Sequence, residues 1–99
     1  MNIAEYIPVG HENAISRKRL AMITGLSDRQ IRQLIERANA GGEVAIINMQ
    51  DGSGYFQPDL KDEGDCLALH FFVLAEIARI NSTRRKLAGP QKMLEKIGA

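Results

Sequence analysis

The feature that most constrains the fold is a short basic helix, a glycine and a second helix in immediate succession. Ser16 suits the N-cap of a helix over residues 17–24, because its hydroxyl can accept a hydrogen bond from the first turn. Gly25 can end that helix in the left-handed conformation, which carries no steric cost for glycine. The sequence therefore predicts a tight turn directly after the first helix.

The second helix has the stronger start signal. Ser27 and Gln30 have the Ser-x-x-Gln spacing of a capping box, so we expect a helix over residues 27–40 that ends at Gly41-Gly42. We expect Gln30 to serve this cap rather than a ligand. Its apolar residues recur three and four positions apart and predict one buried face: Ile31, Leu34, Ile35 and Ala38.

A β-hairpin is predicted after the second helix. The β-branched run Val44–Asn48 favours a strand, residues 51–54 have turn chemistry, and residues 55–57 can form the returning strand before Pro58. Since neighbouring residues of a strand face opposite sides, we expect one of Tyr55 and Phe56 in the core and the other partly exposed. The fold class is thus mainly α with a small β-hairpin wing.

The remainder of the chain predicts an acidic stretch, residues 59–65, that serves as a connector or as the start of a helix, and a helical extension, residues 66–99. The extension lacks Gly and Pro from Cys66 to about Leu87, is expected to break at Gly89-Pro90, and can add a short helix over residues 91–97. Residues 1–58 form the predicted winged domain.

The long helix carries two apolar stripes, where a surface helix of a small domain needs one. We expect one stripe to cover the winged domain and the other to meet a second copy in a homodimer, although burial of both within one chain is an alternative. The expected dimer contacts are Leu69, Phe72, Val73, Ile77 and Ile80.

Charge is unevenly distributed in a chain whose net charge is only +1. Residues 14–40 hold six cations and two anions, residues 51–65 hold five anions and one cation, and residues 79–99 hold six cations and one anion. Such basic blocks can form an electrostatic footprint for nucleic acid.

Composition and motifs exclude several other classes. At 99 residues with 44% apolar and 25% charged residues, the chain is typical of one soluble domain. A single cysteine, no signal-peptide pattern and no long apolar run predict a cytoplasmic protein without a membrane segment. Cys66, His70 and His11 lack metal-site spacing, and no catalytic constellation is recognisable, so we expect no enzyme activity, metal or cofactor.

The ordered set of motifs resembles the winged helix-turn-helix of bacterial and phage DNA-binding proteins, particularly the biotin-repressor-like subgroup. The resemblance covers Ile15 to Pro58. It rests on five motifs at matching spacings: Leu20-Ala21, Gly25-Leu26-Ser27, Ile31-Arg32 with Leu34-Ile35, the Ile46-Ile47 strand and Gly54-Tyr55-Phe56. The large enzymatic domain of the biotin-repressor type has no counterpart here, so ligase activity is not carried over.

This resemblance implies that helix 27–40 enters the major groove of double-stranded DNA. Arg29, Arg32 and Gln33 would then read bases, while Arg17, Lys18 and Arg19 would hold phosphates. The complete expected DNA-binding set is Ser16, Arg17, Lys18, Arg19, Ser27, Arg29, Arg32, Gln33 and Arg37.

The expected function is therefore sequence-specific DNA binding by a transcriptional or replication regulator of phage or mobile-element type. The alternative is a protein-protein interaction adaptor that uses a winged scaffold and the apolar helix without binding DNA. Solvated basic faces are common on helices, so the motif order rather than the charge alone supports the first hypothesis.

Overall fold

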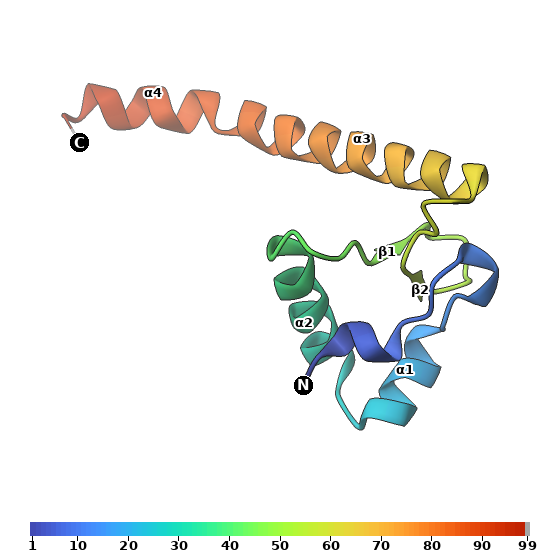
Figure 1. Ribbon diagram of the computed structural model, residues 1–99. Helices are drawn as coiled ribbons and strands as arrows, with labels where there is room; N and C mark the ends of the chain where they lie inside the picture. Colours follow the sequence, from blue (N-terminus) through green and yellow to red (C-terminus); the bar gives the residue numbers. More distant parts are fainter. Residues whose placement is uncertain (99) are drawn as a thin grey trace. The chain divides into compact units, whose positions relative to one another are not determined.

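The computed structural model describes residues 1–98, a mainly helical chain with one small two-stranded antiparallel hairpin (Figure 1). The chain divides into two compact units, Met1–Leu69 and His70–Ala99, and the boundary falls inside α3. The acidic stretch 59–65 belongs to the first unit. The elements are η1 (Ile3–Tyr6), η2 (His11–Asn13), α1 (Arg17–Thr24), α2 (Asp28–Ala40), β1 (Ile47–Asn48), β2 (Tyr55–Phe56), α3 (Glu63–Lys86) and α4 (Ala88–Lys96).

Both predicted helices of the first unit are confirmed, together with their ends. The Ser16 hydroxyl accepts a hydrogen bond from the Arg19 amide at 3.1 Å, and Gly25 ends α1 with a φ of 71°. These local signals succeed because every partner lies within one helical turn of the other.

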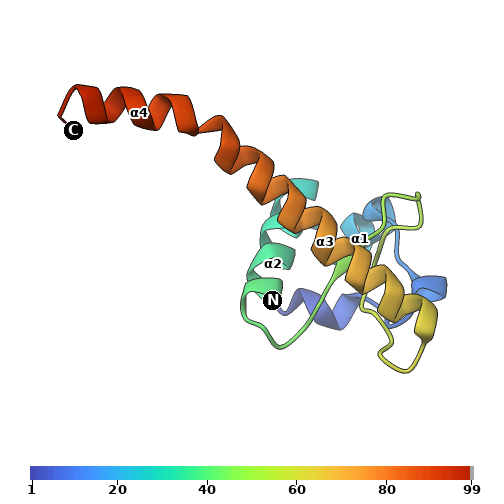
Figure 2. The same cartoon turned by 90° about the horizontal axis from the view of Figure 1, so that it is seen from above.

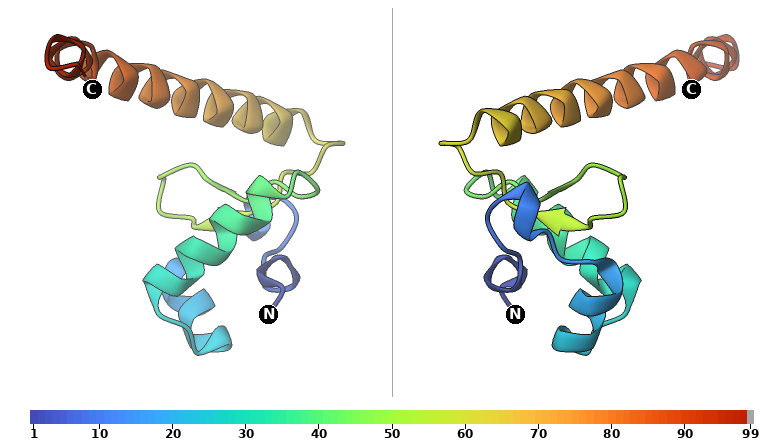
Figure 3. Two further views of the ribbon diagram at one scale, coloured as in Figure 1. Left: turned by 90° about the vertical axis from the view of Figure 1, so that its left-hand side faces the viewer. Right: turned by 90° about the vertical axis from the view of Figure 1, so that its right-hand side faces the viewer.

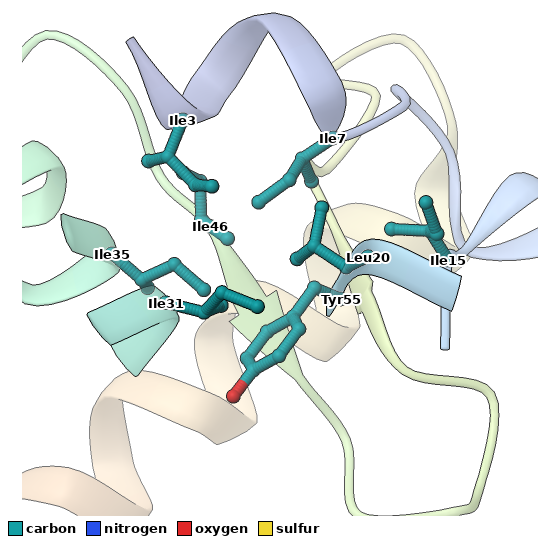
Figure 4. Packing of buried hydrophobic residues seen from close by; sticks show 8 residues of the cluster. All are labelled: Ile3, Ile7, Ile15, Leu20, Ile31, Ile35, Ile46 and Tyr55. Atoms are coloured by element: carbon teal, nitrogen blue, oxygen red, sulfur yellow. The ribbon is translucent and has the colours of Figure 1, made fainter. Parts of the chain in front are cut away.

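The core of the first unit is formed by aliphatic side chains from η1, α1 and α2 and by residues around the hairpin. Figure 4 shows these side chains converging, with the predicted inner face of α2 represented by Ile31 and Ile35. Leu34 and Ala38 are partly buried against the same cluster, in agreement with their spacing. The cluster consists of Ile3, Ile7, Ile15, Leu20, Ile31, Ile35, Ile46 and Tyr55.

The first strand is shorter than the sequence predicts. The β-branched pattern favours pairing over Val44–Asn48, but β1 is only Ile47–Asn48. The reason is a side chain: Asn39 of α2 donates to the Ile46 carbonyl at 3.0 Å and accepts from the Ile46 amide at 2.8 Å. This pair of bonds satisfies the backbone before Ile47 without a strand partner.

The second strand is paired on both edges. Phe56 lies opposite Ile47 in the hairpin, while Tyr55 exchanges two backbone hydrogen bonds with Ile15, of 2.8 and 2.9 Å. Gln57 is likewise bonded to the chain around Val9. The loop that joins the two strands extends away from them (Figure 3).

The expectation that one of Tyr55 and Phe56 is partly exposed was wrong, because both are buried. Tyr55 faces the aliphatic core. Phe56 faces the other side of the strand and stacks on the His11 ring, with centroids 4.6 Å apart and planes 12° from parallel. A residue 45 positions earlier in the chain therefore covers the second face of the strand.

The helix α3 begins at Glu63, inside the acidic stretch, so the end of this stretch is a helix start and its first part is the connector. Asp62 explains this start, since its carboxylate accepts a hydrogen bond from the Asp65 amide at 2.9 Å and so caps the first turn. Asp65 itself is buried and accepts from the backbone amides of Asp59 and His11 at 2.8 and 3.2 Å. The acidic connector is thus a structured anchor.

The predicted break at Gly89-Pro90 was misplaced. The α3 helix ends at Lys86, Leu87 forms the turn, and Gly89 and Pro90 lie in the first turn of α4 (Figure 2). Proline lacks the amide that would continue α3, but the first turn of a new helix needs no such donor.

Candidate nucleic-acid interface

The basic end of α1 is exposed. Arg17, Lys18 and Arg19 occupy its first turn, and all three side chains are exposed to solvent, as is Ser16. The packing of Leu20, which is fully buried, orients this turn by fixing the opposite face of the helix. Three cations therefore lie at a helix N-terminus, the arrangement that suits phosphate groups.

The start of α2 is fixed by the capping box that the sequence predicts. The Gln30 amide donates to the Ser27 hydroxyl at 3.2 Å, and the Ser27 amide donates to the Gln30 side-chain oxygen at 2.9 Å. Gln30 thus serves the cap, as expected. Arg29, Arg32 and Gln33 are exposed on the same half of the helix.

A carboxylate joins the two helices. Asp28 accepts two hydrogen bonds from Arg17, at 2.9 Å from Nε and 2.8 Å from Nη2, and also pairs with Nε of Arg32 at 3.1 Å. The contact with Arg17 is bidentate, which fixes the plane of the guanidinium. The Arg32 side chain remains largely exposed to solvent.

The pKa values of this cluster follow from its hydrogen bonds. The hydrogen bond from Arg17 is the main cause of the lowered pKa of Asp28; desolvation opposes it, and the charges of Arg17 and Arg32 lower the pKa further. The same bond raises the pKa of Arg17. The cluster therefore keeps one negative and two positive charges at neutral pH.

Tyr55 links this cluster to the core. Burial raises the pKa of its hydroxyl, and the charges of Arg17, Asp28 and Arg32 act on it as well. In Figure 4 its ring lies among the aliphatic side chains, and its hydroxyl points out of the cluster. The Tyr55 hydroxyl therefore lies close enough to the charged cluster for its charges to act on it.

The other predicted cations make no ion pair with any of residues 1–98. Lys18, Arg19, Arg29 and Arg37 are all exposed, and Arg37 lies in the last turn of α2. Together with Arg32 they give α1 and α2 an exposed basic surface, which we call the basic surface of the helix pair. All of these residues are among those that the sequence predicted.

The hairpin loop brings polar residues beside the end of α1, and Asn48 and Gln50 among them were not expected there. Asn48, Gln50, Gly52 and Gly54 line a depression of about 280 Å³ together with Ser16 and Arg17 of the α1 end. Asn48 and Gln50 carry no charge and belong to no motif, so nothing in the sequence distinguishes them. Their amides offer donors and acceptors beside the basic surface of the helix pair.

His11 holds this loop in place. Its Nε2 lies 2.8 Å from an Asp51 carboxylate oxygen and 3.2 Å from the Ser53 hydroxyl. Hydrogen bonds from the Ser53 side chain and backbone lower the pKa of Asp51 to about 2, and His11 adds to this effect. No local pattern could have revealed His11, since its partners lie 40 or more residues away.

The residues expected at a dimer contact lie along α3. Val73, Ile77 and Ile80 are 47%, 48% and 56% exposed, whereas Leu69 and Phe72 are partly buried. The other apolar stripe of α3 runs through Leu67, Phe71 and Leu74, which are exposed too. From His70 to Gly98 no residue is buried.

Metal and membrane sites are the other kinds of site that the chain could hold. Within residues 1–98 no group of three His, Cys, Asp or Glu side chains is arranged to hold a metal ion. By length and composition alone, the helical stretch Glu63–Lys96 could cross a membrane, with a mean hydropathy of 1.2 in its most apolar part. Within that stretch Glu76 and Arg79 form an ion pair at 3.0 Å.

Comparison with protein-family models, curated proteins and solved structures found no match to this chain. The candidate interface therefore rests on its own geometry: two capped helices, a carboxylate that positions two arginines, and a polar loop beside them.

Proposed function

We propose that this protein is a sequence-specific double-stranded DNA-binding protein of the winged helix-turn-helix type, acting as a homodimer in the control of transcription or replication. The observation that carries the proposal is the pair α1 and α2, joined by a left-handed glycine and a capping box, with an exposed basic surface. An amphipathic helix with its first half free and basic suits insertion into a major groove.

In this proposal α2 is the recognition helix. Arg29, Arg32 and Gln33 would meet base edges, because arginine can bind guanine O6 and N7 with two hydrogen bonds and glutamine can do the same with adenine. The Arg32 side chain is 60% exposed although it pairs with Asp28, so its guanidinium can reach a base.

The phosphate contacts would come from the ends of both helices. Lys18 and Arg19 at the start of α1 and Arg37 near the end of α2 are free cations among the described residues. Phosphate contacts hold the protein in register but carry no sequence information. Ser16 and Ser27 would add hydroxyl contacts at the two N-caps.

The proposal includes a homodimer because one small DNA-binding domain forms few contacts with DNA. Two-fold dimers are the commonest oligomers, and a palindromic site presents two half-sites to them. The exposed apolar residues Val73, Ile77 and Ile80 on α3 provide a surface for the partner.

The test begins with selection of duplexes from a random-sequence DNA pool, followed by titration of the selected duplex at several salt concentrations. We expect enrichment of a palindromic sequence and a plot of log K against log salt with a slope near −0.9 for each phosphate neutralised. Absence of binding near 100 mM salt, with no enrichment, would refute the proposal.

Single substitutions test the division of roles. Arg29→Ala should reduce preference for the selected sequence, because a bidentate pair contributes roughly 1–3 kcal/mol of discrimination. Lys18→Ala should weaken binding to all duplexes alike and reduce the salt slope by about one unit. Lys92→Ala, in α4, serves as the matched control. Equal effects of Arg29→Ala and Lys18→Ala would contradict the assignment.

The rival proposal, an adaptor that binds another protein through α3, is favoured by the exposed apolar residues of that helix. It predicts no salt-dependent DNA binding. The same titration therefore separates the two functions.

A further inference from the structure

One line of side chains on α3 follows alternating steps of four and three residues. Its members lie within about 40° of one direction on a helix of 3.6 residues per turn. Val73 and Ile77 form its centre and are each about half exposed. The full line, which we call the seam, is Cys66, His70, Val73, Ile77, Ile80 and Arg84.

The spacing of the seam is the same in both directions. Counted from Ala75, each member has a counterpart at the same distance on the other side: Val73 and Ile77, His70 and Ile80, Cys66 and Arg84. A line with this symmetry matches an antiparallel copy of itself, whereas a parallel copy would place each residue beside its own equivalent.

We propose that two copies of this chain pair through this seam with their α3 helices antiparallel. In that pair Val73 lies opposite the partner's Ile77, His70 opposite the partner's Ile80 and Cys66 opposite the partner's Arg84. This inference rests on the homodimer of the proposed function and adds its orientation and register.

The charges of α3 favour the same orientation. The exposed acids Asp62 and Glu63 lie at the start of the helix, and Arg84, Arg85 and Lys86 lie in its last turn. An antiparallel pair brings the basic end of each copy to the acidic end of the other. A parallel pair would place the three cations of each copy beside those of its partner and would align both helix dipoles, and both effects are unfavourable.

A second copy of the chain also explains the exposed apolar side chains of residues 70–98 better than a lipid bilayer does. No residue from His70 to Gly98 is buried, so the apolar side chains need a cover. His70, Glu76 and Arg79 lie among them, and a charged side chain at the centre of a bilayer costs about 2.5–3.5 kcal/mol on insertion scales. At the surface of a helix pair the same groups can remain in water.

The single cysteine makes this orientation measurable. Positions 66 and 84 are about 27 Å apart along one helix, far beyond the roughly 7 Å that a disulfide allows between Cα atoms, so any bond between them joins two chains. Under a mild oxidant, we expect the Arg84→Cys variant to form a covalent dimer linked between positions 66 and 84. The unsubstituted chain, with Cys66 alone, should remain largely uncrosslinked.

The matched control is Arg85→Cys, whose thiol is turned about 100° away from the seam and should crosslink at least tenfold more slowly. A second pair avoids position 84. His70→Cys and Ile80→Cys, each combined with Cys66→Ser, should form disulfides with one another when mixed. Neither should do so alone. Sedimentation before oxidation checks that each variant still dimerises.

Three results would overturn the inference: rapid crosslinking of the unsubstituted chain through Cys66, a dimer by sedimentation whose Arg84→Cys variant does not crosslink, or a monomer at high concentration. A monomer that floats with neutral phosphatidylcholine vesicles would indicate a membrane instead. None of these measurements uses DNA. If the DNA titration fails while the expected disulfides form, DNA binding is refuted and the antiparallel pair stands. If DNA binds while the disulfides do not form, the antiparallel pair is refuted and DNA binding stands.

Discussion

The two units of this chain are stabilised in different ways. Met1–Leu69 has a continuous core in which Leu20, Ile31 and Ile46 are fully buried. From His70 to Gly98 the chain is helical but has no buried residue, although Val73, Leu74 and Ile77 are apolar. An isolated helix is only marginally stable in water, because its stability in proteins comes mainly from packing. The first unit can therefore fold on its own contacts, whereas the second depends on a cover.

The largest expected effect tests this contrast directly. Ile31→Ala removes a fully buried side chain from the first unit and should lower the free energy of unfolding by about 2–5 kcal/mol. This loss should be the same at all protein concentrations. Ile77→Ala, at a half-exposed position of α3, should lower the free energy of unfolding by less. This loss should increase with protein concentration, because more of the chain is then dimeric. Urea unfolding at two protein concentrations measures both, and a concentration-independent effect of Ile77→Ala would remove the contrast.

The next effect concerns backbone packing inside the first unit. Gly54 has a φ of 101°, and a Cβ there would overlap the Ile15 carbonyl oxygen that accepts the Tyr55 amide. Gly54→Ala should therefore lower the free energy of unfolding by about 3 kcal/mol or more, from strain and the loss of this pairing. Gly52→Ala is the matched control, with a φ of 88° and open space around its Cβ. It should cost only about 1 kcal/mol, and equal losses would exclude the close approach to Ile15.

A smaller effect is expected at the basic surface of the helix pair. Asp28→Asn removes the carboxylate that fixes Arg17 and Arg32. The preference for the selected sequence over random duplexes should therefore fall by roughly three- to tenfold, which is part of the discrimination that one bidentate arginine contributes. Binding to random duplexes should become slightly tighter, since a negative charge is lost. Glu36→Gln removes an exposed charge from the same helix without such a contact and should strengthen binding to all duplexes equally. Unchanged base preference in Asp28→Asn would mean that the carboxylate does not position Arg32.

The smallest effect is a pH dependence of stability at the hairpin loop. Hydrogen bonds from Ser53 lower the pKa of Asp51 from 3.8 to about 2, so the folded state favours the ionised form. The resulting stabilisation is present above pH 4 and is lost as the pH falls towards 2. Asp51→Asn should flatten this part of the stability curve in acid titrations monitored by urea unfolding, whereas Glu43→Gln should not. A slope that survives in Asp51→Asn would assign it to other carboxylates.

The sequence predicted the helical part of the first unit closely. The limits of α1, the capping box of α2 and the buried face at Ile31 and Ile35 all depend on residues within about one turn of one another. The exposed positions of Arg29 and Gln33 follow from the same periodicity. Local hydrogen bonds and helical spacing are sufficient to specify such features.

The same reasoning was less accurate where distant residues compete for the backbone. Asn39 bonds to the Ile46 backbone and shortens β1, and His11 buries Phe56 from the far side of the strand. Asp28 could be paired with Arg32 from their four-residue spacing, but its stronger contact with Arg17 crosses the turn between two helices.

By itself, the sequence determined the order of the elements from α1 onwards, the capped helix pair with its exposed cations, and the presence of a long apolar helix. Only the tertiary structure decided which carboxylate holds the arginines, which polar residues line the hairpin loop, and that the acidic connector anchors the first unit through buried Asp65. The physical reason is the sequence separation between the residues that form each feature. A cap or a helix face is set within a few residues, whereas His11 meets Asp65 across 54 residues once the core has closed.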